Sequence, residues 1–307
     1  MNAARGLRVA GSLYYRGMRM LGIPAATRRL QSAGPILCYH NVVPAGYDGI
    51  GVAGGHMPRD TFERQMRWLV KHYTVISLTE FVDKLERGAS LRSTAVIAFD
   101  DGYTGVFEQA APVLRALGIR ATVFVVAEAV GRSEGFWWDQ PSIANTVTAS
   151  RLEGWLTDLR GDDEAIVREA APQGRSRLPR SHLPANWHTI LGWLGKGIEI
   201  GVHSSTHRSL PMLTDDELDH EIEDSRVAVH HATGVWPQFF AYPYGHCDAR
   251  VRERVRIAGY RAALSLDPGL VCAGADAWTL RRINVPAGIS DAAFEAWTAG
   301  LQATEGV

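Results

Sequence analysis

Cysteine is scarce in this chain of 307 residues. The three cysteines, Cys38, Cys247 and Cys272, are odd in number, lie far apart and form no C-x-x-C motif. They therefore do not supply the paired framework that stabilises small disulfide-rich secreted domains. Cysteines that are few and do not form a disulfide framework favour a reducing compartment.

Long apolar runs are also absent, because no stretch approaches the roughly 20 residues of a membrane-spanning helix. The first residues lack the continuous apolar core of a secretory signal, since Arg8, Arg16 and Arg19 interrupt each apolar stretch. We therefore expect a cytoplasmic protein, with peripheral contact to the inner membrane surface as an option. The formal net charge of −1 gives no reason to expect a nucleic-acid partner.

Acidic residues are missing before Asp48, and the same part of the chain holds six arginines. Residues 1–33 interleave these arginines with apolar and aromatic residues, and we treat them as a segment separate from the catalytic unit at 34–307. Two interpretations stay open. The segment is either a basic amphipathic element on an anionic membrane surface or a helix packed on the fold with its arginines in water. The six are Arg5, Arg8, Arg16, Arg19, Arg28 and Arg29.

The chain has a regular alternation of short apolar strands with helices. Its length and its 46% apolar content allow one large α/β barrel or two ordinary domains. The alternation predicts parallel β/α units. We expect strands at 35–42, 95–99, 121–126, 198–202, 238–242, 261–265 and 279–285. We expect helices at 60–72, 79–88, 105–117, 187–194, 215–233, 249–258 and from about 291.

Residues 132–185 interrupt this alternation. They contain F-W-W-D at 136–139, a polar helical segment and a stretch rich in proline and arginine. An insertion of this size is usually a lid, a binding surface or a flexible flap.

Two of the expected strands end in groups that bind metals. Asp100 and Asp101 follow the strand 95–99, and Gly102 lets the chain turn so that both carboxylates reach one cavity. His203 and His207 follow the strand 198–202, at a spacing that places both rings on one face of a helical turn. One carboxylate and two imidazoles bind a catalytic divalent metal, and the second carboxylate is a ready general base. The alternatives are solvated turn acids and surface histidines.

A third motif, A-Y-P-Y-G at 241–245, follows another apolar run. Its proline and glycine fix a turn that can aim a backbone N–H, that of Tyr244, at a developing oxyanion. A plain strand-to-helix turn is the alternative.

In these three motifs the chain resembles the polysaccharide deacetylase family, the NodB-homology enzymes of carbohydrate esterase family four. The resemblance covers residues 35 to about 290, without the insertion. It implies a distorted (β/α)7 barrel that removes an N-acetyl group from an amino sugar. It further implies that Asp100 is the general base, that the Tyr244 N–H binds the oxyanion, and that a divalent metal, most often Zn²⁺, is held by Asp101, His203 and His207.

The chain departs from the family pattern at two places. Ala241 stands where an arginine usually orients the catalytic aspartate, and Arg281 or Arg282 is the candidate replacement, of which we select Arg282. The late histidine that serves as the acid is also absent. Some exopolysaccharide deacetylases of the family carry an early Tyr-His motif instead, which resembles Tyr39-His40 here. We therefore assign the acid to His40, with His246 as the fallback; a histidine satisfied by hydrogen bonds at the strand end is the alternative.

Substrate contacts are expected from Tyr39, from Trp138 and Asp139 in the insertion, and from Trp278, which by analogy with the family would wall the acetyl pocket. The insertion tryptophans also fit a core of their own. The expected substrate is an N-acetylated amino-sugar glycan or a lipid-linked sugar. The rivals are a deformylase or other sugar amidohydrolase, and a non-catalytic glycan-binding barrel.

Overall fold

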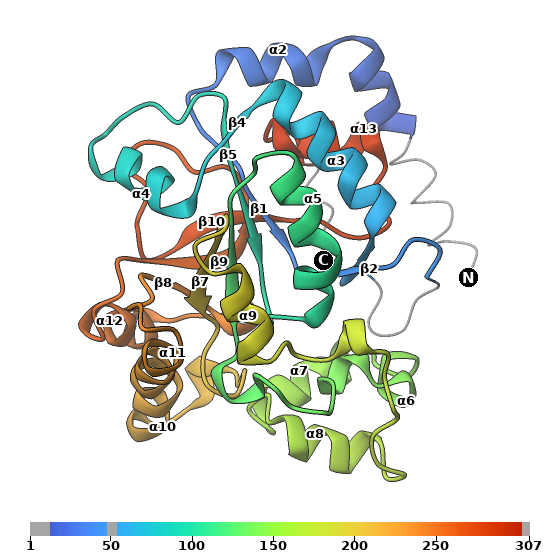
Figure 1. Cartoon of the computed structure of the whole chain (residues 1–307), viewed down its shortest axis with the longest axis vertical. Coiled ribbons are helices and arrows are strands. Elements are labelled where there is room, and N and C mark those ends of the chain that lie inside the picture. Colours follow the sequence, from blue (N-terminus) through green and yellow to red (C-terminus); the bar gives the residue numbers. More distant parts are fainter. Residues whose placement is uncertain (1–12, 48–53, 303–307) are drawn as a thin grey trace.

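The computed structural model describes residues 13–47 and 54–302. Seven parallel strands close into a barrel, because β1 pairs with β5 on one side and with β10 on the other (Figure 1). The fold class predicted from the sequence is thereby confirmed. The barrel strands are β1 (Ile36–Tyr39), β5 (Thr94–Phe99), β6 (Ala121–Val125), β7 (Ile198–Val202), β8 (Phe239–Ala241), β9 (Ala262–Pro268) and β10 (Leu280–Asn284).

Three short strands lie outside the ring. β4 (Thr74–Val75) extends the sheet beside β5, while β2 (Asn41–Val43) and β3 (His56–Pro58) form a separate parallel pair directly after β1. The strand expected at 35–42 is therefore divided between β1 and β2. His40 lies at this break.

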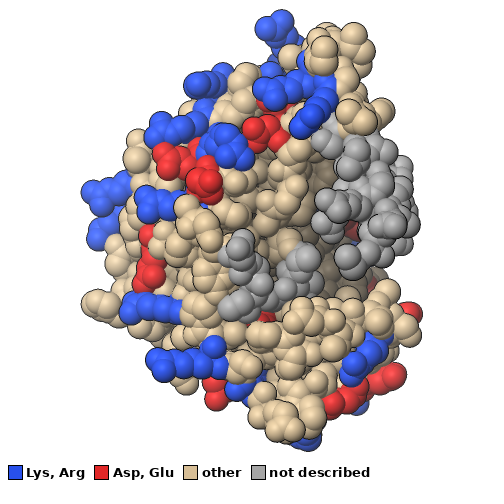
Figure 2. Space-filling model, turned by 90° about the vertical axis from the view of Figure 1, so that its right-hand side faces the viewer, with Lys and Arg blue, Asp and Glu red and all other residues tan. Residues whose placement is uncertain are grey.

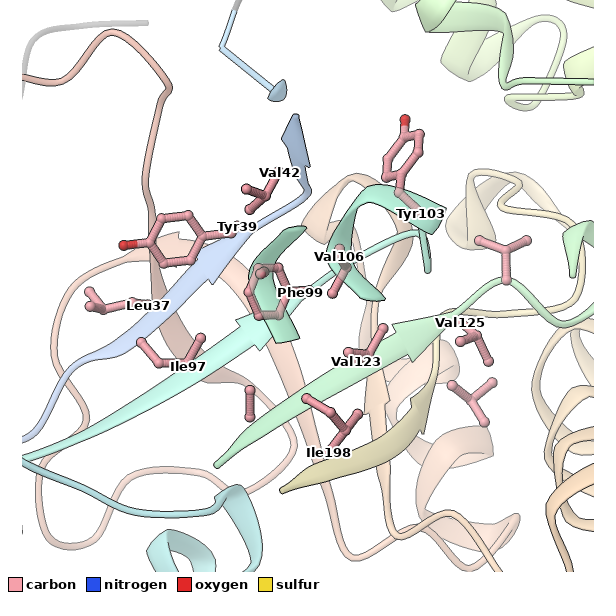
Figure 3. Close-up of a cluster of buried hydrophobic side chains, with 14 of the residues drawn as sticks. Leu37, Tyr39, Val42, Ile97, Phe99, Tyr103, Val106, Val123, Val125 and Ile198 are labelled. Carbon is pink, nitrogen blue, oxygen red and sulfur yellow. The ribbon is translucent and has the colours of Figure 1, made fainter. Parts of the chain in front are cut away.

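Alternating side chains of each strand form two apolar layers. One layer lies between the barrel and its helices and includes Leu37, Ile97, Phe99 and Val123 (Figure 3). The other includes Val96 and other residues of the opposite strand face, together with side chains of α4 (Leu78–Glu86). Burial on both faces explains why the strands read as continuous apolar runs in the sequence.

The remaining helices cover the outside of the ring. They are α2 (Ile23–Leu30), α3 (Arg59–His72), α5 (Ala111–Ala116), α9 (Trp187–Trp193), α10 (Asp215–Asp219), α11 (Ser225–Thr233), α12 (Ala249–Ile257) and α13 (Asp291–Thr298). No helix among the described residues is long and apolar enough to span a bilayer.

Two expected helices are interrupted by π-helical turns. Val106–Ala110 precedes α5, and His220–Asp224 separates α10 from α11. The helix expected at 79–88 is α4, which begins one residue earlier, at Leu78. Ser77 and Glu80 form the capping box there, whereas Thr79 donates to Glu199.

The insertion is a folded cap with a core of its own. Its helices are α6 (Pro141–Ala144), α7 (Ala149–Thr157) and α8 (Asp163–Ala170), and they lie together at one end of the barrel (Figure 1). Trp137 and Trp155 pack edge to face at 5.4 Å inside this core, beside Ile143 and Ile166. The cap therefore holds the residues that follow β6 in a fixed place.

Candidate active site

A cavity of about 320 Å³ opens where the barrel strands end and the insertion begins. Because all the strands are parallel, their carboxyl ends meet at this one rim. Two aspartates that follow β5, two histidines that follow β7 and one histidine that follows β1 therefore share the cavity wall. These are Asp100, Asp101, His203, His207 and His40.

The turn after β5 brings both aspartates inward. Asp101 and Gly102 each have a φ of 69°, in the left-handed region that favours glycine. A Cβ at Gly102 would also lie 3.0 Å from the side chain of Val125. Both the positive φ and this close approach explain why glycine follows the two carboxylates.

Asp101 and the two histidines form a buried ligand set. The Asp101 Oδ1 lies 3.6 Å from His203 Nε2 and 3.5 Å from His207 Nε2. His203 Nδ1 donates to the carbonyl of Ala241 at 2.7 Å, so its Nε2 carries the lone pair that faces the carboxylate. Asp101 Oδ1 is buried without a hydrogen-bond partner.

Burial raises the pKa of Asp101 and lowers those of His203 and His207, because all three charged forms are desolvated. An unpaired buried carboxylate oxygen facing two imidazole nitrogens is a costly arrangement without a cation. These residues therefore fit a divalent ion that takes nitrogen and oxygen ligands, such as Zn²⁺.

His203 and His207 reach this position from a loop, so the helical turn expected from their spacing is wrong. Ser204 and His207 both have a φ of 65°. The Ser204 hydroxyl accepts from the His207 N–H at 2.9 Å, and the Glu221 carboxylate accepts from the N–H groups of Ser205 and Thr206. The loop is thus fixed by hydrogen bonds, and two left-handed residues aim the rings.

Asp100 is paired with a buried arginine. Arg282 Nη1 donates to Asp100 Oδ1 at 2.7 Å, and Arg282 Nε donates to the Ser265 carbonyl at 2.8 Å. Burial is the largest influence on Asp100 and acts to raise its pKa, but the Arg282 charge and hydrogen bond, together with His203 and His40, hold that pKa below its ordinary value. Arg282 is 0% exposed, whereas the neighbouring Arg281 faces solvent. The guanidinium therefore keeps Asp100 ionised and fixes its position.

Comparison with known proteins agrees with this geometry. Residues 87–263 match the family described as polysaccharide deacetylase. The chain belongs to the polysaccharide deacetylase family. Membership indicates a hydrolase that deacetylates carbohydrate, and it confirms the resemblance drawn from the motifs.

Two curated proteins are similar to this chain in sequence. The Bacillus subtilis protein YxkH is 22% identical over 270 residues, which cover 87% of this chain and 77% of that protein. Chitin deacetylase 1 of Saccharomyces cerevisiae is 37% identical over 71 residues, 23% of this chain and 24% of that one.

Solved structures share the fold. IcaB from Ammonifex degensii superposes with a TM-score of 0.62 at 20% identity, over 88% of this chain and 98% of that one. The Streptococcus pyogenes deacetylase PplD, solved with acetate, gives a TM-score of 0.61 at 16% identity, over 88% and 98%.

His40 lines the cavity of this family member, on the same strand face as Cys38. The Cys38 thiol donates to Asp100 Oδ2 at 3.5 Å, and ligand atoms of Cys38, His40 and Asp100 lie within 4.8 Å of one another. Burial lowers the pKa of His40 to about 4, so its imidazole is neutral near pH 7. His246, the fallback acid, is exposed and does not line the cavity.

Tyr244 lies in the turn Pro243–Gly245 with a φ of 57°. Its ring meets that of His207 edge to face at 4.6 Å, and its hydroxyl accepts from Trp137 Nε1 at 3.4 Å. The tyrosine therefore joins the barrel rim to the insertion beside the ligand set. Tyr244 thus lines the cavity, and the role of its backbone N–H stays a prediction.

Asp139 is fully buried and both its oxygens are engaged. Oδ1 accepts from His56 Nε2 at 2.8 Å and Oδ2 accepts from the Tyr103 hydroxyl at 2.7 Å. Asn41 donates to His56 Nδ1 at 3.0 Å, which leaves the proton on Nε2. Asp139 also lines the cavity, and its contact with substrate stays a prediction. Asp139 fixes the cavity wall by tying the insertion to β3 and to the turn after β5.

Trp138 is held by the same network, since its Nε1 donates to the Tyr103 hydroxyl at 2.7 Å. One face of its indole stacks on Phe136 at 4.6 Å, and its ring lies 4.6 Å from that of His207. Trp138 is half-buried and lines the cavity, where a sugar ring can reach it.

Two other predicted substrate contacts are wrong. Tyr39 is 1% exposed, and its hydroxyl donates to Gln65 at 2.8 Å in the layer outside the barrel (Figure 3). Neighbouring residues of an extended chain face opposite ways, so Tyr39 and His40 do not share the cavity. Trp278 precedes β10 and is not among the residues that line the cavity; its carbonyl accepts from the Tyr242 hydroxyl at 2.9 Å.

Sequence reasoning missed several residues of the wall. His56 and Tyr103 in the wall, and Cys38 behind it beside Asp100, carry no motif, and their contacts cross from one element to another. The remaining wall is largely apolar and comes from the insertion and from the ends of the last strands. Its missed members are Val147, Leu152, Leu266, Asn284 and Pro286.

Proposed function

We propose that this protein is a metal-dependent hydrolase that removes an N-acetyl group from an amino sugar in a glycan or glycan precursor. One observation carries the proposal. A buried Asp-His-His ligand set, a carboxylate kept ionised by an arginine and a neutral histidine face one cavity at the barrel rim. Family membership independently supports carbohydrate deacetylation.

Asp101, His203 and His207 would hold the metal, with Zn²⁺ as the ion that suits the donor set best. A divalent ion bound there supplies Lewis-acid chemistry, which polarises the acyl oxygen and acidifies water. The remaining chemistry comes from protein groups.

Asp100 is the proposed general base. Its carboxylate lies beside the ligand set, with Oδ2 at 3.8 Å from His203 Nε2, and Arg282 occupies Oδ1. Oδ2 is therefore the atom that takes the proton of the attacking water. The Tyr244 N–H is the proposed donor to the oxygen on which negative charge develops.

His40 is the proposed acid for the departing amine. A neutral imidazole carries a proton on only one of its two nitrogens. His40 must therefore receive a second proton during the reaction before it can act as the acid. Ligand atoms of Asp100 and His40 lie within 4.8 Å of each other, a separation that one water can bridge, so Asp100 can pass on the proton taken from water. One proton thus moves from water through Asp100 and His40 to the amine, while the hydroxyl group goes to the acyl carbon.

The cavity wall favours an uncharged sugar. No lysine or arginine is among the described residues that line it, so a phosphate has no cationic partner inside. Trp138 offers an indole face on which the apolar side of a sugar ring can stack. For a lipid-linked substrate, we therefore place the amino sugar inside and the phosphate and lipid outside.

Acetate release tests the proposal. Metal-stripped protein is assayed with and without zinc on N-acetylated sugar oligomers and lipid-linked sugars, beside Asp100→Asn. The exposed Asp216→Asn is the matched control. Zinc-dependent release that only Asp100→Asn abolishes is expected. Faster release of formate from the N-formyl sugar would favour the deformylase. Tight glycan binding without turnover of either sugar would favour the binding protein.

A further inference from the structure

Residues 13–30 expose an unusual amount of apolar surface. Six of the twelve large apolar side chains that the described structure exposes lie in this short segment. Met20 is 89% exposed, Leu30 79% and Leu21 77%. The whole set, called here the arm face, is Leu13, Tyr14, Met20, Leu21, Ile23 and Leu30.

The arm face is not the side by which the segment packs on the barrel. Residues 13–20 are helical, and Tyr15 and Met18 of this helix pack inward against alanines of α13. Trp297 Nε1 donates to the Tyr15 hydroxyl at 2.9 Å. In α2, the Arg28 guanidinium lies 5.3 Å from the Trp68 ring centroid. The helices are therefore anchored through one side and present a second apolar side outward.

Position along the helix explains the two sides. The outward residues include two pairs spaced by seven residues, namely Leu13 with Met20 and Tyr14 with Leu21. This spacing places them on one helical face. Packing on the fold accounts for the inward residues but not for this outward set. A helix that only rests on a barrel would carry polar side chains there.

The segment that carries the arm face is itself basic. Arg16 and Arg29 are exposed and form no ion pair among the described residues, whereas Arg19 is paired with Glu295 at 3.2 Å. No aspartate or glutamate precedes Asp48 in the sequence. The end of the molecule that carries α2 in Figure 1 shows lysine and arginine side chains beside uncharged ones in Figure 2, with fewer acidic side chains among them.

We propose that the arm face docks on the surface of a bilayer that contains anionic lipids. Exposed apolar side chains enter the interface and the flanking arginines meet lipid phosphates. A second copy of this chain is disfavoured as the occupant, because a two-fold interface would set Arg16 and Arg29 against the same arginines of the partner. The proposal does not depend on the reaction at the barrel rim.

Vesicle flotation of the full chain tests the proposal. Phosphatidylcholine vesicles are compared with vesicles that also contain phosphatidylglycerol, at low and high salt. The variants are Met20→Ser/Leu21→Ser and Arg16→Gln/Arg29→Gln. Ile257→Ser, which removes an apolar side chain of 67% exposure from α12, is the matched control.

We expect the wild type and Ile257→Ser to bind the anionic vesicles equally, with weaker binding at high salt. The arginine variant should bind about thirtyfold less tightly, because each surface arginine contributes about fivefold. The Met20→Ser/Leu21→Ser variant should lose flotation. Thermal melts of all variants should match the wild type, since the changed side chains are exposed.

Absence of flotation by the full chain would overturn the proposal, as would equal binding by the variants. Concentration-dependent self-association that Met20→Ser/Leu21→Ser abolishes, without vesicle binding, would identify a second copy as the occupant and would also overturn it. Acetate release from a soluble substrate reports separately on the proposed function, so the two can fail independently.

Discussion

Replacement of Arg282 by glutamine should both destabilise the protein and move its pH profile. The variant leaves Asp100 buried without the guanidinium that lies 2.7 Å away. Removal of one partner of a buried ion pair costs about 3–5 kcal/mol. For a chain of this size, that corresponds to a fall in Tm of about 5–8 °C. Arg281→Gln, the exposed neighbour on the same strand, should change Tm by less than about 1 °C.

The pH profile follows from the opposing influences on the pKa of Asp100. Burial raises this pKa, and the charge and hydrogen bond of Arg282 supply a large part of the opposing effect, beside His203 and His40. Without Arg282, the pKa should rise above the ordinary value of about 4. Because a general base acts when it is ionised, kcat/KM of the variant should fall off at a higher pH than that of the wild type. Arg282→Lys, which restores one positive charge, should recover part of the acid-side activity.

A double variant separates this reasoning from a general loss of packing. In Arg282→Gln/Asp100→Asn neither side chain is charged, so the stability lost in Arg282→Gln should largely return. Differential scanning calorimetry and pH–rate profiles measure the two effects. If Arg282→Gln kept the wild-type Tm and the wild-type acid limb, the proposed coupling between the two residues would be refuted.

Three further predictions concern other parts of the structure. Asp139→Asn should lower the free energy of unfolding by about 1–3 kcal/mol in urea titrations and raise KM, because it weakens the acceptor shared by His56 and Tyr103. An unchanged KM would contradict the role of this network in the cavity wall. Saturating zinc should raise the Tm of metal-stripped protein, and His207→Ala should abolish that rise; an equal rise in the variant would place the zinc elsewhere. The Thr214 N–H and the arginine beside Glu217 lower the pKa of Glu217 to about 2. Its contribution to stability is therefore present above about pH 4.5 and lost as the pH falls toward 2, and Glu217→Gln should remove this part of the pH dependence of Tm.

The sequence by itself determined which strand ends carry the metal-binding groups. D-D-G after one strand and H-S-S-T-H after another are local signals, and parallel strands bring their carboxyl ends to one rim wherever the chain runs between them. The barrel and the ligand set were therefore predictable. The error at Tyr39 was avoidable, because adjacent residues of an extended chain face opposite ways and His40 already faced the cavity.

Only the tertiary structure decided which groups support that site. Arg281 and Arg282 are adjacent in the sequence, and the choice between them depends on which face of β10 turns inward when the barrel closes. Asp139 accepts hydrogen bonds from His56 and Tyr103, which are 83 and 36 residues away in the sequence. Such contacts leave no periodic pattern, because the fold of the insertion and its docking on the rim create them. Local spacing carries information about the end of one strand, whereas the orientation of a buried ion pair or hydrogen-bond network depends on several elements at once.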